Sequence, residues 1–182
     1  VAEQDDRVME QYLERGDVDP ELFHAGLRRG CIEKRLIPVL GGAAFQNQGV
    51  QPLLDAIVRY LPSPVDIPPI AGVNGEGIRR ADPSEPFAAL AFKVVTDRYA
   101  GRLVFVRVYS GMVKVGETIL NSSTGKKIRL TKIFRMHADK RTPLEETAAG
   151  DIVAVVSSSP INTGDTLCDP NAPILLEKIQ FP

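Results

Sequence analysis

The residues with the clearest chemical potential in this sequence are basic, and they gather in residues 126–141, where Asp139 is the only acid. Alternate side chains of an extended strand share a face, so Lys127, Arg129 and Arg135 are expected to line one face, opposite Ile128 and Leu130. Lys140 and Arg141 would extend this face at the end of the strand. Such a face can bind a phosphate backbone through salt-dependent contacts. Charge geometry alone selects the candidate contacts, which are Lys127, Arg129, Arg135 and Lys140.

The same basic face has a simpler interpretation, as the solvated outer wall of a β domain. No phenylalanine, tyrosine or tryptophan falls on the face expected for the basic residues, so stacking on nucleobases is not indicated. The sequence pattern by itself leaves both interpretations open.

Catalytic patterns are absent from the sequence. It holds no GxxxxGK[ST] phosphate loop and no Gly-x-Ser-x-Gly nucleophile turn. His24 and His137 are isolated, whereas a metal site needs three or four ligands at close spacing. The adjacent acids Glu145 and Glu146 fall in a polar connection, where such pairs are usually solvated. The sequence therefore predicts no catalytic residue and no metal site.

Composition narrows the class of protein. The 182 residues carry a net charge of −1 and are 43% hydrophobic, which is enough for one large domain or two small ones. No run approaches the ~18 apolar residues of a membrane span, and no signal-peptide pattern opens the chain. Cys31 and Cys168 are expected to be free thiols, as in a cytoplasmic protein without a membrane partner.

The first third of the chain has helical periodicity, with helices predicted over residues 2–15, 20–30 and 50–61. Asp19 before Pro20 is typical of a helix start, and Gly30 is taken as the end of that helix. A short strand is predicted over residues 35–40. The third helix is expected to bury an apolar row consisting of Val50, Leu53, Leu54, Ile57, Val58 and Leu61.

A lone strand between helices has no partner for its backbone groups. Residues 1–61 are therefore interpreted as the incomplete end of a larger α/β domain. Residues 62–85 are rich in proline and glycine and are predicted to be a linker and loop.

From residue 86 onward the pattern changes to short strands separated by turns, which favours a closed β-barrel over residues 86–173. Val104, Val106 and Val108 alternate within one strand and indicate its buried face. A long strand is predicted over residues 127–136, with Phe134 and Met136 inward. Lys132 interrupts that inward row and suggests a bulge or an end of the barrel. Residues 174–182 are expected to begin a following domain.

The hairpin of residues 93–111 closely resembles the opening of the second domain of elongation factor G, a translational GTPase. Arg135-Met136-His137-Ala138 resembles a stretch specific to this factor among its relatives. Further similar stretches follow in the same order along the chain, at residues 42–51, 55–56, 60–66, 120–122, 149–152 and 163–169.

The resemblance implies a mixed fold, in which an all-β translation-factor barrel follows a helical remnant of a GTP-binding domain. It implies that the longer protein is a ribosomal translocase, with the ribosome and its small-subunit RNA as partners beside the missing domains of the same chain. The barrel would dock without doing chemistry. An alternative is an inter-domain scaffold, or protein-interaction module, of a diverged paralogue, for example in ribosome recycling.

The resemblance also assigns a remnant of the guanine-recognition loop, consisting of Ala43, Ala44 and Phe45. The family places serine where this chain has Ala43, so the hydroxyl that would brace the loop is lost, while a main-chain contact through Ala44 can persist. GTP is thus expected as a cofactor of the longer protein and not of these residues alone.

Overall fold

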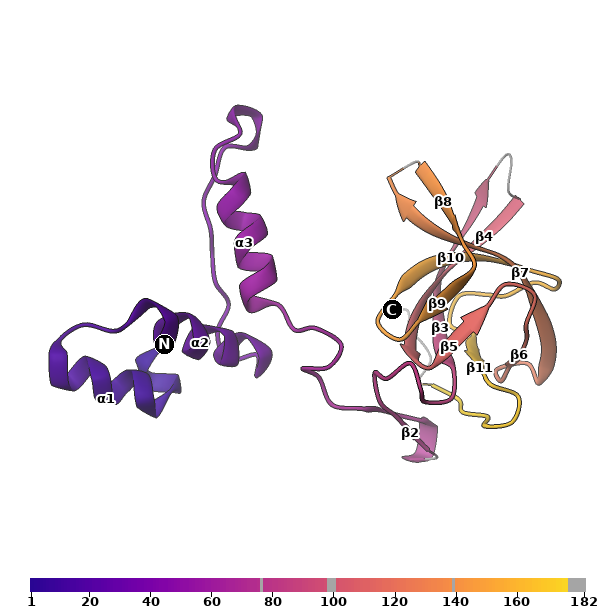
Figure 1. The fold of residues 1–182 in the computed structure, drawn as a ribbon, viewed down its shortest axis with the longest axis horizontal. Helices are drawn as coiled ribbons and strands as arrows, with labels where there is room; N and C mark the ends of the chain where they lie inside the picture. Colours follow the sequence, from indigo (N-terminus) through magenta and orange to yellow (C-terminus); the bar gives the residue numbers. More distant parts are fainter. Residues whose placement is uncertain (76, 98–100, 139, 177–182) are drawn as a thin grey trace. The chain divides into compact units, whose positions relative to one another are not determined.

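The computed structural model describes residues 1–75, 77–97, 101–138 and 140–176, and it divides into two compact units, Val1–Ile67 and Pro68–Pro182 (Figure 1). The turn of the predicted hairpin at residues 98–100 lies outside the described residues. So does the predicted final segment beyond residue 176. Each unit is described by itself.

The N-terminal unit is helical. Asp5 and Asp19 begin its first two long helices by accepting backbone N–H groups of the first turn, and Pro20 occupies the first helical position of the second, as its sequence predicts. The elements are η1 (Ala2–Gln4), α1 (Asp6–Arg15), α2 (Pro20–Ile32), η2 (Ala44–Gln46) and α3 (Val50–Tyr60).

The sequence predicts that helix α2 ends at Gly30, but the helix continues to Ile32. A Cβ at Gly30 would lie 2.5 Å from Leu36 Cδ1, so the glycine makes room for the chain that folds back over the helix. The role of Gly30 is therefore close packing and not termination.

The strand predicted over residues 35–40 is wrong. These residues have no strand assignment, and the side chains of Ile37 and Val39 are 86% and 92% exposed. The N-terminal unit offers no described strand with which they can form a ladder, and Pro38 removes one donor. Apolar composition alone did not produce a strand here because the hydrogen-bonding partner is lacking.

Helix α3 forms as predicted, but its predicted buried row is wrong. Val50, Leu53, Leu54, Ile57, Val58 and Leu61 are all exposed, and Ala56 and Tyr60 are the residues of this helix that are buried. The Tyr60 hydroxyl lies 2.6 Å from His24 Nδ1 of α2, so the contact with α2 uses a different side of the helix.

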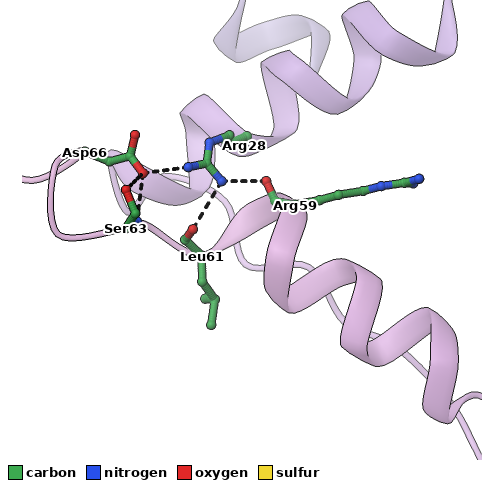
Figure 2. A network of polar contacts seen from close by, with 5 residues as sticks. All are labelled: Arg28, Arg59, Leu61, Ser63 and Asp66. Atoms are coloured by element: carbon green, nitrogen blue, oxygen red, sulfur yellow. Dashed lines mark hydrogen bonds and ion pairs between the residues drawn. The ribbon is translucent and has the colours of Figure 1, made fainter. Parts of the chain in front are cut away.

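A polar network joins α2 to the segment that follows α3 (Figure 2). The Arg28 guanidinium donates to the carbonyl oxygens of Arg59, at 2.8 Å, and Leu61, at 3.2 Å, and it contacts Asp66 Oδ2 at 2.6 Å. The same carboxylate oxygen accepts from the backbone N–H and the hydroxyl of Ser63, both at 2.7 Å. Arginine, with its fixed fork of donors, can hold all three acceptors together.

The C-terminal unit is a closed antiparallel barrel (Figure 1). Its order is β10-β4-β3-β11-β6-β7, and β10 also pairs with β7 to close the ring, while β8 continues outward from β7. The ring strands are β3 (Ala88–Asp97), β4 (Gly101–Ser110), β6 (Thr118–Asn121), β7 (Lys126–His137), β10 (Ile152–Ser157) and β11 (Thr166–Cys168), with β8 (Lys140–Leu144) beyond them.

The barrel core confirms the alternation seen in the sequence. Val104, Val106 and Val108 of β4 are each at most 2% exposed and pack inward with Leu130 of β7 and Leu167 of β11. Closure of the sheet pairs both edges of each ring strand, so the core is enclosed without an open sheet edge.

The predicted interruption of β7 is a β-bulge. Lys132 pairs with Val156 of β10, whereas the next pair joins Leu130 to Ser157, which leaves Thr131 as an extra residue. Ile133 takes the inward position after the bulge and is 1% exposed. Phe134 and Met136, predicted inward, are therefore only half-buried, because the extra residue exchanges the two faces of the strand.

Several short strands were not predicted from the sequence. A hairpin of β1 (Ile70–Ala71) and β2 (Ile78–Arg79), with η3 (Val73–Gly75) between them, lies where a linker and loop were predicted. Strand β5 (Met112–Lys114) pairs with β9 (Glu146–Ala148) as a separate ribbon. Strand β8 contains Pro143, which an outer strand tolerates because one of its sides needs no donors.

Candidate nucleic-acid interface

The first half of β7 presents its basic side chains outward, as predicted. Lys127 and Arg129 are exposed and alternate with Ile128 and Leu130, which are 2% and 1% exposed in the core. Lys127 pairs with Leu120 of β6, and Arg129 pairs with Thr118. No acid therefore lies directly across this pairing from either basic residue.

The bulge at Thr131 divides the predicted basic face. Beyond it, Lys132 takes the outward position, while Arg135 falls on the side of the strand that carries Ile133. Arg135 and Lys140 remain exposed, but they belong to the β7–β8 hairpin that extends from the ring. The expectation of one continuous face from Lys127 to Arg135 is wrong, because a single extra residue reverses the alternation.

We call the outward residues Lys127, Arg129 and Lys132 the basic wall. Among the residues that the structure describes, no ion pair joins these side chains to a carboxylate. Arg129 also has a structural role, since its Nε donates a hydrogen bond to the carbonyl oxygen of Gly116 at 2.8 Å. Lys127 and Lys132 are therefore the members whose charge is least engaged within the chain.

An aromatic row lies beside the basic wall, and the sequence analysis missed it. Ala154 of β10 pairs with Phe105 of β4 on one side and with Phe134 of β7 on the other. Cross-strand partners point to the same face of a sheet, and this is the outer face because Val153 and Val155 point into the core. Two phenyl rings thus flank a small, fully buried alanine on the barrel surface.

Cations border the aromatic row. Lys93 pairs with Phe105, and its Nζ lies 5.9 Å from the centre of that ring, while Phe92 approaches the same ring at 6.3 Å. Arg107, two residues further along β4, lies 5.2 Å from the ring centre of Tyr109. Aromatic and basic residues therefore do interleave on the folded surface, because the bulge places Phe134 of β7 outward and Ala154 joins it to Phe105.

The predicted guanine-loop residues lie in the N-terminal unit, within a tight exposed loop. Ala43 donates its N–H to the carbonyl of Gln48 at 3.0 Å, and Ala44 begins the short helix η2. The side chain of Phe45 is fully exposed. A Cβ at Gly49 would lie 2.9 Å from Gly42 Cα, so glycine at this neck lets the two ends of the loop approach.

Residues that are typical of catalysis remain scattered. Among the described residues, no three side chains of His, Cys, Asp or Glu gather to hold a metal ion. Glu146, one of the adjacent acids, lies 3.6 Å from Lys114 Nζ in an exposed ion pair. Cys31 and Cys168 are free. The helices that the structure describes are each too short or too polar to cross a membrane.

The sequence of the barrel matches a known family. Residues 101–168, which span β4 to β11, match the family described as Elongation factor Tu domain 2. The barrel is of the translation-factor type. Its closed ring of antiparallel strands agrees with that assignment.

One solved structure is similar to this chain over its whole length. The crystal structure of the protein ttk003000868 from Thermus thermophilus superposes with a TM-score of 0.68 at 26% sequence identity, and the match covers 100% of this chain. It covers 26% of that protein, so the chain spans about a quarter of the length of the structure it matches. Residues 101–168 are thus similar to the second domain of elongation factor Tu, and the activity of any longer protein is a matter for proposal.

Proposed function

We propose that the barrel docks on small-subunit ribosomal RNA, as part of a longer cytoplasmic translocase that uses GTP to move tRNA and mRNA through the ribosome. The observation that carries the proposal is the outer surface of a translation-factor barrel, where the basic wall lies beside an aromatic row. In this role the barrel positions its neighbours on the ribosome and performs no chemistry.

Two kinds of contact favour RNA as the partner of this surface. Lys127 and Lys132 offer exposed ammonium groups without a described acidic partner, and each phosphate that they neutralise releases counterions. Phe105 and Phe134 add half-buried rings that can contact an unpaired base. Arg135 and Lys140, on the hairpin beyond the ring, would extend the contact along a phosphate backbone.

The test is a titration of the whole 182-residue chain with purified small ribosomal subunits at two salt concentrations. Loss of two phosphate contacts should lower the slope of log affinity against log salt by about 1.4 to 1.8 in Lys127→Gln/Lys132→Gln. Lys114→Gln, which changes an exposed lysine outside the basic wall, is the control and should bind as the original chain does. Absence of binding at low salt, or equal binding by both variants, would refute the RNA role of this surface.

Guanine recognition by the loop of residues 43–45 is the second part of the proposal. Phe45 is exposed and Ala43 carries no hydroxyl, so recognition would depend on the main chain at Ala44. The phosphate loop is not in this sequence, and we expect the 182-residue chain to show no GTP turnover. Measurable GTP turnover by the purified chain would contradict this expectation.

The scaffold function is the second candidate, and the exposed apolar row of α3 favours it. Leu53, Leu54 and Ile57 are each more than 40% exposed, as residues of an interface are before the partner binds. Under this alternative, Lys127→Gln/Lys132→Gln should leave ribosome affinity unchanged, whereas Leu54→Asp and Ile57→Asp should reduce assembly with the remaining domains.

A further inference from the structure

A groove of about 560 Å³ lies in the barrel unit, and none of the basic-wall residues lines it. Three stretches of chain form it: residues 83–87 before β3, residues 112–119 from β5 to the start of β6, and residues 169–171 after β11. The three stretches are far apart in sequence, so only the folded barrel creates this groove.

The lining of the groove is apolar at its base. Phe87, Val113 and Ile119 are buried beneath it, at 5%, 2% and 3% exposure, and Met112 is 41% exposed. Pro83, Pro86 and Pro170 also line the groove. Prolines and a flexible methionine offer apolar contact area to a side chain of a partner.

Fixed hydrogen bonds hold the groove walls in place. The carbonyl of Asp82 accepts from Gly111 N–H at 2.9 Å, and that of Phe87 accepts from Asp169 N–H, also at 2.9 Å. Gly111 has φ of +69°, and a Cβ there would lie 2.5 Å from the Phe87 backbone, so the two walls meet as closely as glycine allows. A preformed groove of this kind has little ordering entropy left to lose on binding.

The lining of the groove is acidic. Glu85, Glu117 and Asp169 line the groove, and its one lysine, Lys114, is already paired with Glu146 at 3.6 Å. One oxygen of Glu117 accepts Lys114 N–H and one oxygen of Asp169 accepts Asn171 N–H, which leaves each carboxylate a second oxygen. These carboxylates repel phosphate and favour a cationic partner.

The backbone beside the groove suits an extended partner. Gly111 carbonyl and Val115 N–H bond to the chain that contains β9, and alternate residues of an antiparallel pair point their peptide groups oppositely. The peptide groups of Met112 therefore point away from β9, and no described residue pairs with them. An added strand could pair there by the same hydrogen bonds that build a sheet.

We propose that this acidic groove binds an extended protein segment in which an apolar residue is flanked by lysine or arginine. The apolar side chain lies against Met112 and the prolines, the flanking cations meet Glu85, Glu117 and Asp169, and the segment's backbone pairs with Met112. The inference does not depend on the RNA-docking proposal, because the two surfaces differ in residues and in the sign of their charge.

The test uses the whole 182-residue chain labelled with ¹⁵N and a short synthetic peptide whose central leucine is flanked on both sides by lysines. We expect salt-sensitive binding, with amide shift changes concentrated at residues that line the groove. Glu85→Lys should weaken binding about tenfold, since it reverses a charge that faces the peptide. Glu10→Lys, an exposed acid of α1, is the matched control and should leave binding unchanged.

Three outcomes would overturn the inference: no binding by the lysine peptide, equal binding of a peptide with glutamates in place of the lysines, or shift changes elsewhere in the chain. Met112→Pro serves as a second variant, because proline removes the free N–H and should also weaken binding. The double variant Lys127→Gln/Lys132→Gln should bind the peptide normally, so failure of the RNA proposal would not imitate failure of this one.

Discussion

The two units of this chain differ in how completely they bury their apolar side chains. The barrel closes on itself and encloses a continuous apolar core, in which Leu130, Ile133 and Ile161 are almost completely buried. The helical unit leaves Leu54 and Val58 of α3 more than half exposed. A closed sheet supplies its own partners for both its backbone and its apolar face, whereas an amphipathic helix depends on whatever packs against it.

Polar contacts compensate in part for the small core of the helical unit. Arg28 joins α2 to the segment after α3 (Figure 2), and the buried Asp5 pairs with Arg29 at 2.7 Å. Ion pairs in which at least one side chain is partly exposed contribute less to stability than a packed core does. The comparison leads to the expectation that the barrel unfolds cooperatively and that the helices open more readily.

The largest expected effect comes from truncating a leucine in each unit. Leu130→Ala should destabilise the barrel by roughly 2–5 kcal/mol, because it removes a side chain that is 1% exposed and leaves a cavity. Leu54→Ala, at 56% exposure, should cost the helical unit less than about 1 kcal/mol. Hydrogen exchange measured peptide by peptide would report the stability of each unit separately. Equal losses of stability in the two units would contradict the expected difference between them.

Two glycines allow a matched test of turns in the two units. Gly16 ends α1 with φ of +70°, Gly125 joins β6 to β7 with φ of +71°, and neither has a neighbour within 4 Å of an added Cβ. Replacement by alanine should cost about 1 kcal/mol at either site, since the left-handed conformation is unfavourable for L residues. Gly125→Ala should lower the protection of backbone amides from hydrogen exchange across the barrel. Gly16→Ala should lower this protection only around α1. Protection lost over both units from either change would contradict this view.

A smaller effect is expected from Arg28→Ala, which removes the donor that contacts Arg59, Leu61 and Asp66. Amide exchange of residues 59–66 should become severalfold faster, while exchange in β4 and β7 should not change. Arg15→Ala, an exposed arginine of α1, is a control for the loss of charge. Unchanged exchange at residues 59–66 would show that the network does not hold this segment.

The smallest expected effect is on pH dependence. Hydrogen bonds from Ser63, assisted by the charge of Arg28, lower the pKa of Asp66 below its usual 3.8, and those from Ser84 do the same for the pKa of Asp82 in the barrel unit. A lowered pKa in the folded state means that the ionised group stabilises the fold above 3.8, and that this stabilisation is lost as pH falls through the folded pKa.

Carboxyl NMR titration should therefore give midpoints below 3.8 for both aspartates. Ser63→Ala should raise the Asp66 midpoint, and Ser84→Ala should raise only that of Asp82. On acidification, opening should be confined to residues 61–66 in the helical unit and to the turn at residues 82–85 in the barrel unit. Midpoints at or above 3.8 would exclude these hydrogen bonds in solution.

The sequence predicts the structure correctly where the signal is local. The alternating valines of β4 and the cap at Asp19 each depend on a few neighbouring residues, and both are confirmed. The failures required knowledge of a distant partner. The strand at residues 35–40 has nothing to pair with, and the exposed row of α3 has nothing described to cover it.

The candidate site shows the same division. The exposure of Lys127 and Arg129 follows from the alternation in β7 and is confirmed, while their contact with RNA stays a prediction. The aromatic row could not be predicted, because Phe105 and Phe134 become neighbours only through Ala154 when β10 closes the ring. A bulge was predicted from Lys132, but which face Arg135 would occupy depended on the pairing with β10.

The amino-acid sequence by itself determined where the three long helices and β4 form and which side of β4 is buried, because helix caps and alternation act within a few residues. Tertiary structure decided which outward side chains share a surface. Closure of the barrel joined the aromatic row to the basic wall and formed the acidic groove from three distant stretches. Such surfaces depend on strand order and register, which are fixed when the whole core is buried at once.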